Sequence, residues 1–275
     1  MSRITQKGRH STGLLATEDG FIVMTTRDDL FDAAVGRGLV DVLAETSYQL
    51  FPLGTKCIRG DQVWRYCKAG STGLDIAAPV QSAALVHAEQ EDDIVCGAAA
   101  AIGDTEVEIT STANLDGSPN DEDNDFRSGY LIVNDVTGEG QCKKIKSNEG
   151  FATTADSTFV LYDKLTIALT TSSQLGLVRS PYYKVIATAA VVSGCVVGVP
   201  QFAVTANYWF WCQTGGVAAV VAQAAIAKGT EVVVGTSAGK ADPAAAATTE
   251  VCIGHPYTAG IADTESMLVF LTLDR

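Results

Sequence analysis

The chain has 275 residues, of which 47% are hydrophobic and 19% are charged, and it carries a formal net charge of −13. The apolar content excludes global disorder and is enough for one large β domain or two smaller ones. The acidic balance argues against nucleic-acid binding, which needs clustered Lys and Arg to replace phosphate counterions, and against docking on an anionic membrane.

Residues 1–45 are expected to form an N-terminal arm with a short helix. Residues 1–13 are polar and basic and contain no apolar segment typical of a secretory signal. No run in the chain reaches the roughly 18–20 apolar residues of a transmembrane helix. Apolar residues from Asp28, a suitable N-cap, to residue 45 have helical spacing. Gly36 and Gly38 interrupt this spacing, so we expect a broken helix or a helix followed by a turn.

Beyond residue 53 the pattern becomes that of short strands separated by turns. Val63–Lys68 is expected in a strand pair, with Val63, Arg65 and Cys67 on one face and Trp64, Tyr66 and Lys68 on the other. Glu106–Thr110 alternates between polar and apolar residues, which predicts a half-buried strand. Further strands are expected at Ala83–His87, Ile94–Cys96, Thr158–Tyr162, Leu165–Leu169, Glu231–Val234, Val251–Gly254 and Met267–Leu273.

A β-hairpin is predicted between Gly129 and Lys146. Tyr130 and Ile132 belong to one face of its first strand, whereas Leu131 and Val133 belong to the other. A Gly-Glu-Gly turn at residues 138–140 leads into a second alternating run. This glycine pair indicates turn geometry and not a phosphate-binding loop.

The last part of the chain reads as a separate block of strands. An aromatic strand over 204–211 is expected to turn at Gly215-Gly216 into a second strand over 217–221. Turn signals recur every 8–12 residues, which is typical of sandwiches and barrels. We therefore predict a mainly β protein with β-sandwich or barrel (jelly-roll-like) domains, divided into the arm (1–45), a β-rich domain (46–198) and a C-terminal β domain (199–275).

The seven cysteines are far apart in the sequence, their number is odd, and none forms a Cys-x-x-Cys pair. This spacing favours reduced, buried thiols over a disulfide framework or a zinc site.

Candidate chemistry in the sequence is sparse. The acidic loop ending in Asp121, Asp123 and Asp125 has the spacing that begins an EF-hand, but Phe126 and Ile132 occupy the positions that need Gly and Glu. A solvated loop is the default interpretation, with a different kind of calcium site as the alternative.

The histidines, His10, His87 and His255, accompany no nucleophile elbow, zinc-protease motif or glycine-rich phosphate loop. Surface or hydrogen-bonded histidines are the expected reading. We predict no catalytic, cofactor-binding or metal-binding residue.

The aromatic run Tyr208, Trp209, Phe210 and Trp211 is the candidate interaction site. On a strand, Tyr208 and Phe210 share one face while Trp209 and Trp211 share the other. One face is therefore expected in the core and the other in a self-association interface. A carbohydrate platform is the alternative.

The chain also resembles decoration or cement proteins of tailed-bacteriophage virions. The similar segments are the aromatic strand with the Cys212-Gln213-Thr214 that follows it, Ile253-Gly254-His255-Pro256, Leu268-Val269-Phe270-Leu271, Trp64–Gly70 and the Gly-Glu-Gly-Gln hairpin. The resemblance covers about residues 50–275.

This resemblance implies a non-enzymatic, homotrimeric structural protein that binds the major capsid protein on the outer surface of an icosahedral shell. It also implies assembly in the host cytoplasm, with no nucleic acid, membrane or cofactor as partner. The alternatives are a head fibre or a receptor- or glycan-binding virion protein, the major capsid protein itself, and a hydrolase in which His87 or His255 meets two carboxylates.

Overall fold

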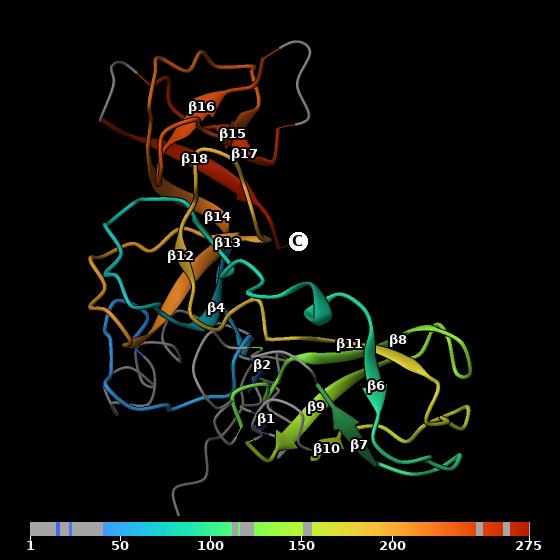
Figure 1. Cartoon of the computed structure of the whole chain (residues 1–275). Helices are drawn as coiled ribbons and strands as arrows, with labels where there is room; N and C mark the ends of the chain where they lie inside the picture. The colour runs from blue at the N-terminus through green and yellow to red at the C-terminus, as the bar shows by residue number, and fades with distance from the viewer. Residues whose placement is uncertain are drawn as a thin grey trace, which may run out of the picture. The chain divides into compact units, whose positions relative to one another are not determined.

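The computed structural model is mainly antiparallel β-structure with almost no helix (Figure 1). It describes residues 41–111, 115, 124–150, 156–245, 250–260 and 265–274, together with the backbone of β1 (Leu15–Ala16) and β2 (Ile22–Val23). The predicted arm and its helix over 28–45 lie mostly outside these residues. Within 41–45 the chain forms a turn at Val42-Leu43.

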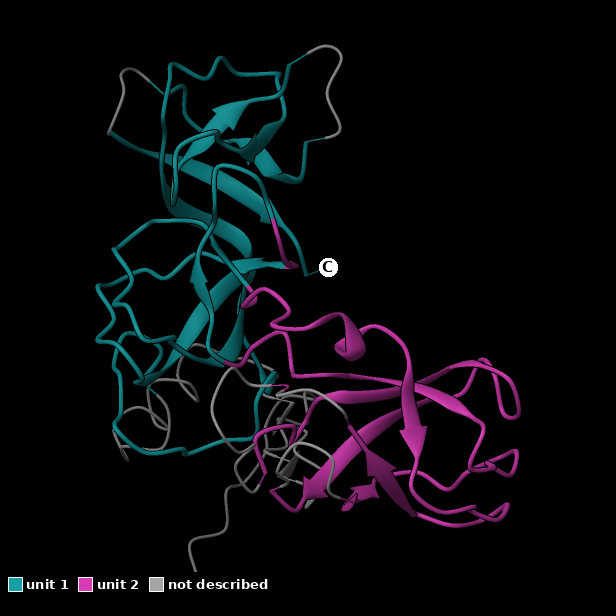
Figure 2. Cartoon of the chain, in the orientation of Figure 1, with its two compact units in different colours: residues 1–81, 184–192, 196–275 teal, residues 82–183, 193–195 magenta. Residues whose placement is uncertain are grey.

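Two compact units make up the chain (Figure 2). Unit 1 comprises residues 1–81, 184–192 and 196–275, and unit 2 comprises residues 82–183 and 193–195. The units divide the chain differently from the predicted boundaries at 45/46 and 198/199. The physical reason is strand pairing, because segments on both sides of residue 198 belong to the same sheet of unit 1.

Unit 2 is a closed six-stranded barrel. Its strands, in the order in which they neighbour one another, are β10 (Asp156–Leu161), β7 (Glu106–Thr110), β6 (Ile94–Cys96), β11 (Gln174–Val178), β8 (Tyr130–Asp135) and β9 (Cys142–Asn148). The order β11-β8-β9-β10 is a Greek key, in which the fourth strand returns beside the first. Six strands with this topology differ from the eight-stranded double Greek key of a jelly roll.

The predicted hairpin is confirmed as β8 and β9. Leu131 pairs with Lys143 and Ile132 pairs with Cys142, and the connecting loop holds Gly138 and Gly140 at positive φ. Leu131 and Val133 point into the barrel core, whereas Tyr130 and Ile132 remain exposed, as the alternation predicts. Glu106–Thr110 and Ile94–Cys96 are likewise confirmed as strands.

Two of the predicted strands in unit 2 are wrong. Ala83–His87 is irregular and leads into the short 3-10 helix η1 (Ala88–Gln90), for which His87 is the N-cap. Leu165–Leu169 is a loop, although both of its leucines are buried in the barrel core. The side chain of Gln141 holds this loop by accepting hydrogen bonds from the backbone N–H groups of Thr166 and Ile167.

Unit 1 is built on a seven-stranded sheet. Its strands, in order, are β16 (Ala241–Pro243), β15 (Val232–Val234), β17 (Cys252–Pro256), β18 (Ser266–Thr272), β14 (Trp209–Val221), β4 (Gln62–Lys68) and β3 (Lys56–Arg59). A smaller sheet has the order β12 (Ile186–Ala187), β5 (Val80–Gln81) and β13 (Val196–Gly198).

The turn predicted at Gly215-Gly216 is wrong, because β14 runs through both glycines as one strand of 13 residues. The register with β4 shifts between Gln213 and Gly215, which marks a β-bulge. Gly216 has φ +75°, and a Cβ there would collide with the carbonyl oxygen of Asp61. The glycines therefore serve a bulge and a close backbone approach.

The C-terminal part of β14 extends past the end of β4. Glutamine side chains hydrogen-bond to backbone groups on the edge of β14 that β4 does not cover. The Gln201 amide donates to the carbonyl of Ala219 and accepts from its N–H, at 3.2 and 3.0 Å. The amide of buried Gln213 donates to the carbonyl of Val217 at 2.9 Å. Because of these hydrogen bonds, β14 can be longer than the adjacent β4 and still have its backbone groups at Val217 and Ala219 hydrogen-bonded.

Replacing Gly216 with Ala should destabilise unit 1 by about 2 kcal/mol or more, because a left-handed backbone costs a Cβ-bearing residue about 1–2 kcal/mol and the Asp61 carbonyl adds a clash. All three tryptophans lie in unit 1, so urea unfolding followed by Trp fluorescence reports this unit. Gly229→Ala is the matched control, since Gly229 has φ +91° and open space around it. Equal effects of the two substitutions would contradict the close approach.

A cluster of ion pairs joins Asp274, which follows β18, to side chains of β3 and β4. The Asp274 carboxylate accepts from Arg65 Nε at 2.5 Å and from Lys56 Nζ at 3.2 Å. Partial burial opposes ionisation of Asp274, but the hydrogen bonds and charges of Arg65 and Lys56 outweigh it and lower the pKa of this carboxyl. The cluster thus joins the end of the chain to β3 and β4.

Asp274→Asn should destabilise unit 1 by about 1–2 kcal/mol at pH 7, the range of hydrogen bonds to charged groups with partial exposure. Because the folded-state pKa is lowered, the contribution is complete above the usual Asp pKa near 3.9 and is lost as pH falls through the folded value. The stability difference between wild type and variant should therefore be flat from pH 7 to about pH 5 and shrink below about pH 4. A difference that grows on acidification would contradict this assignment.

Candidate functional site

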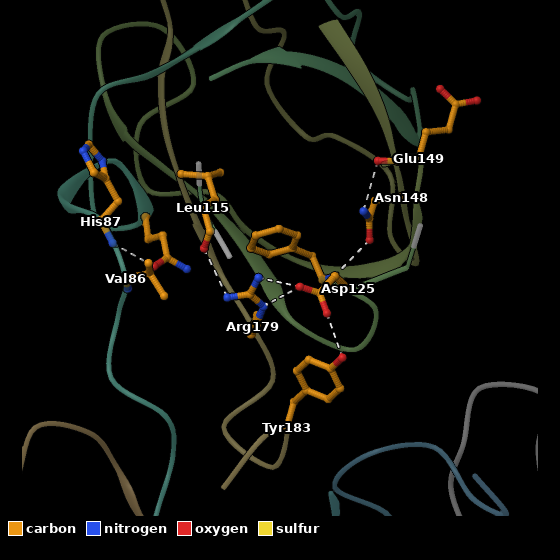
Figure 3. A network of polar contacts seen from close by, with 10 residues as sticks. Val86, His87, Leu115, Asp125, Asn148, Glu149, Arg179 and Tyr183 are labelled. Carbon is orange, nitrogen blue, oxygen red and sulfur yellow. Dashed lines mark hydrogen bonds and ion pairs between the residues drawn. The ribbon is translucent and has the colours of Figure 1, made fainter. Parts of the chain in front are cut away.

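A buried ion pair occupies one end of the barrel in unit 2 (Figure 3). The Asp125 carboxylate accepts from Arg179 Nε and Nη2 at 3.0 and 2.5 Å, and from the Tyr183 hydroxyl at 2.7 Å. Arg179 also donates to the carbonyl of Leu115 at 3.1 Å, and its guanidinium lies 4.8 Å from the centre of the Phe126 ring. The Asp125 side chain is 2% exposed, so the group is internal.

This network has a structural role, because it holds the segment before β8 against neighbouring strands of the barrel. Both Asp125 oxygens accept hydrogen bonds from protein donors, and Phe126 donates its N–H to the Asn148 side chain at 3.1 Å. Residues 124–128 are thereby fixed against the ends of β9 and β11. Because the Asp125 carboxylate is bound to Arg179 and Tyr183, it does not favour a cation site at this position. Asp121 and Asp123 of the predicted acidic loop lie outside the described residues.

The histidines do not assemble a catalytic group in the part of the chain that the structure describes. His87 is exposed, and its Nδ1 accepts from the Glu89 N–H at 3.2 Å as a helix cap. His255 is exposed on β17, opposite Phe270 of β18. His10 lies outside the described residues. Among those residues no group of three or more His, Cys, Asp or Glu side chains is arranged to hold a metal ion.

The aromatic run is mostly internal. Phe210 and Trp211 are buried on opposite faces of β14, while Tyr208 precedes the strand in a turn. Trp211 packs against Tyr66 of β4, with ring centres 5.1 Å apart. Of the four predicted interface residues, only Tyr208 and Trp209 retain exposed surface.

Trp209 is also engaged within unit 1. Its ring stacks on Tyr66 with centres 5.9 Å apart, and Lys68 Nζ lies 5.2 Å from its centroid. A carbohydrate platform needs an open aromatic face, so the burial of Trp211 and these contacts of Trp209 count against a sugar site at this position.

The sequence reasoning missed an open apolar surface, which we call the sheet face. It consists of outward side chains of β14 and β18 in the seven-stranded sheet, together with Tyr257, which directly follows β17. The polar member of this face is His255 of β17, which is exposed opposite Phe270. Leu268 is 39% exposed and Phe270 is 43% exposed, while the alternating Met267, Val269 and Leu271 are buried.

Strand register continues the sheet face sideways. Val217 and Ala219 of β14 lie opposite Phe270 and Leu268, and both are half-buried. On the other side, Tyr257 is 62% exposed and its N–H donates to the carbonyl of Leu268 at 2.8 Å. None of the three strands contains Lys, Arg, Asp or Glu, in a chain of net charge −13.

The sheet face was detectable in principle. An antiparallel strand with one solvated face normally alternates between apolar and polar residues, but Met267–Leu271 is apolar at both alternating sets. That pattern predicts a strand buried on both faces. In the structure one of the two faces is left uncovered by the rest of unit 1.

The cysteines divide into buried and accessible groups. Burial raises the pKa of the Cys57 thiol to about 12 and that of Cys96 to about 11. Burial, together with the adjacent Cys67, raises the pKa of Cys212 well above its usual value. These thiols remain protonated and unreactive at neutral pH. Cys142 and Cys195 are exposed, so the prediction of buried thiols is wrong for these two.

Comparisons of the chain with family models, curated proteins and solved structures find no match. Among the described residues, no helix has the length and apolar character needed to cross a membrane.

Arg179→Met should destabilise the barrel by about 3–5 kcal/mol, because it leaves the Asp125 carboxylate buried without its cation. Tyr183→Phe removes one hydrogen bond to the same carboxylate and should have a smaller effect, of about 1–2 kcal/mol. Hydrogen exchange of the β8–β11 amides measures both effects in unit 2. A loss below about 1 kcal/mol for Arg179→Met would contradict the fastening role.

Proposed function

We propose that the chain is a non-enzymatic structural protein of a bacteriophage virion, which binds the outer surface of the capsid as a decoration or cement protein. The observation that carries this proposal is the sheet face. An exposed apolar surface that contains both an aromatic and an aliphatic side chain is typical of protein interaction sites.

The chemistry of the sheet face suits a protein partner. Phe270 and Tyr257 offer large apolar areas with few rotatable bonds, the kind of side chain that dominates binding energy at interfaces. The absence of charged residues from its three strands removes the desolvation penalty that Asp, Glu or Lys would impose on docking. The partner in this proposal is the major capsid protein.

Several copies of the sheet face in one oligomer would increase the overall affinity for the shell. A trimer on the shell surface would present three copies of the sheet face, so each modest contact would gain from the effective concentration set by the other two. The resemblance of residues 50–275 to cement proteins supports the same assignment. A head fibre and the major capsid protein remain the alternatives within virion structure.

The experiment is co-sedimentation of the purified full-length chain with capsid shells assembled without it. We expect the wild type to pellet with the shells and Leu268→Ser/Phe270→Ser to lose at least about tenfold in affinity, because two exposed apolar anchors are removed. Both positions are partly exposed, so the variant should retain its fold, which far-UV circular dichroism checks.

Val191→Ser is the matched control, because Val191 is an exposed apolar residue of unit 1 outside the sheet face. Its binding should equal that of the wild type. Failure of the wild type to pellet would overturn the capsid assignment. Equal binding by the double variant would overturn the role of the sheet face.

A further inference from the structure

His255 of β17 is the side chain of the sheet face that can change its charge close to neutral pH. The imidazole is exposed and lies directly opposite Phe270 of β18 in the strand register. Histidine side chains take up a proton between about pH 8 and pH 5. The neutral imidazole adds a small aromatic ring to the sheet face, whereas the protonated ring brings a full positive charge to it.

His255 has no group within reach to share that charge. Among the described residues, no hydrogen bond and no ion pair involves its imidazole. Both ring nitrogens are therefore left to water in the free chain and to the partner in a complex. Nothing in the described part of unit 1 holds the ring in one charge state.

The groups that face His255 from β17 and β18 do not supply a countercharge. On β18, Phe270 is opposite and Leu268 and Thr272 are the next residues on the same face. On the chain of β17 itself, the titratable side chains are Cys252 and Tyr257. Thiols and phenols normally ionise only in alkaline solution.

Glu231 is the one carboxylate beside His255 among the described residues. Val232 of β15 pairs with Gly254, so the same antiparallel register places Glu231 next to His255, on the side away from Phe270. Glu231 is exposed and makes no ion pair with His255 in the structure. Because water screens an exposed carboxylate, Glu231 offsets only a small part of a charge on the imidazole.

We propose that the sheet face binds an uncharged apolar surface and that His255 makes this binding dependent on pH, with the neutral imidazole docking and the protonated one releasing the partner. This inference rests on the proposed function of the sheet face as the docking surface. The partner surface is uncharged because Leu268 and Phe270 would leave any carboxylate or ammonium group opposite them desolvated and unpaired.

The direction of the pH dependence follows from desolvation. In the free chain a protonated His255 is hydrated, whereas in the complex it would be covered beside Phe270 by a surface without a countercharge. Docking therefore disfavours the protonated form and releases a proton. By linkage, the affinity is complete above the range in which histidine titrates and falls as pH decreases through that range.

The experiment is co-sedimentation of the full-length chain with capsid shells at pH 8.0 and at pH 5.5. We expect the dissociation constant of the wild type to be about fivefold or more higher at pH 5.5. His255→Gln keeps a polar but uncharged side chain, so its dissociation constant should differ little between the two pH values. The comparison at equal pH removes any effect of acidification on the shells themselves.

Two further variants separate His255 from its surroundings. His87→Gln is the matched control, because His87 is an exposed histidine of unit 2, and it should keep the pH dependence of the wild type. Glu231→Gln removes the neighbouring carboxylate, so its pH dependence should be at least as steep as that of the wild type. Circular dichroism at both pH values establishes that all the proteins are folded.

Retention on a phenyl-agarose column tests the same face without a capsid, since phenyl groups form an uncharged apolar surface. At pH 5.5 the wild type should elute before His255→Gln, and at pH 8.0 the two should elute together. If the wild type pellets with shells at neither pH but shows this difference on the column, the capsid assignment fails while the pH dependence of the sheet face stands.

Three outcomes would overturn the role of His255. The first is a wild type that binds shells equally well at both pH values. The second is a His255→Gln variant that loses as much affinity on acidification, or as much column retention, as the wild type does. The third is tighter binding of the wild type at pH 5.5, which would show that the partner places a negative charge opposite His255.

Discussion

The long strand β14 is the constraint on which unit 1 depends. Its first half pairs with β4 and its second half pairs with β18, on opposite edges, so one strand must serve two sets of neighbours. The bulge between Gln213 and Gly215 lies where the pairing changes, and the Gln201 and Gln213 amides hydrogen-bond to the edge of β14 beyond the end of β4. Without these devices a strand of this length would expose unpaired backbone groups inside the unit.

That constraint also positions the open sheet face. The bulge adds one residue to β14, and Val217 and Ala219 are placed on the exposed side with Leu268 and Phe270, whereas Ala218 and Val220 join the core with Met267 and Val269. Because a shift of one residue exchanges the two faces of a strand, the same bulge decides which apolar set is buried. The exposed set is apolar too, so the register leaves an uncharged surface where a solvated sheet would carry polar residues.

Structural features that depend on neighbouring residues could be predicted from the sequence, whereas features that depend on distant segments could not. The β8–β9 hairpin was predictable because its alternation and its positive-φ glycines act within a few residues. Gly215-Gly216 carries the same local signal, but β14 pairs with β4 and β18, which are distant in the sequence, and it continues as a strand through both glycines. Leu165–Leu169 has apolar residues at alternate positions, as a strand does, but in the structure it is a loop whose Thr166 and Ile167 N–H groups donate to the side chain of the distant Gln141.

The candidate interaction site shows the same division. The sequence singles out Tyr208–Trp211 because aromatic residues cluster there, yet pairing with β4 places Trp211 against Tyr66 and removes it from the surface. Hydrophobicity alone cannot separate a core strand from an interface strand, since both bury apolar area. A core strand is covered by other residues of the same chain, whereas an interface strand is covered by a partner.

Charge is distributed unevenly between the two units. The strands β14 and β18 of the sheet face carry no Lys, Arg, Asp or Glu, while the barrel carries Lys144 and Lys146 on β9, Glu106 and Glu108 on β7, and the exposed Asp156 on β10 between them. Apolar contacts act at short range and change little with salt, whereas interactions between exposed charges act over about a Debye length and weaken as salt rises. A contact through the sheet face is therefore expected to change little with ionic strength, because β14 and β18 bring no Lys, Arg, Asp or Glu side chain to it.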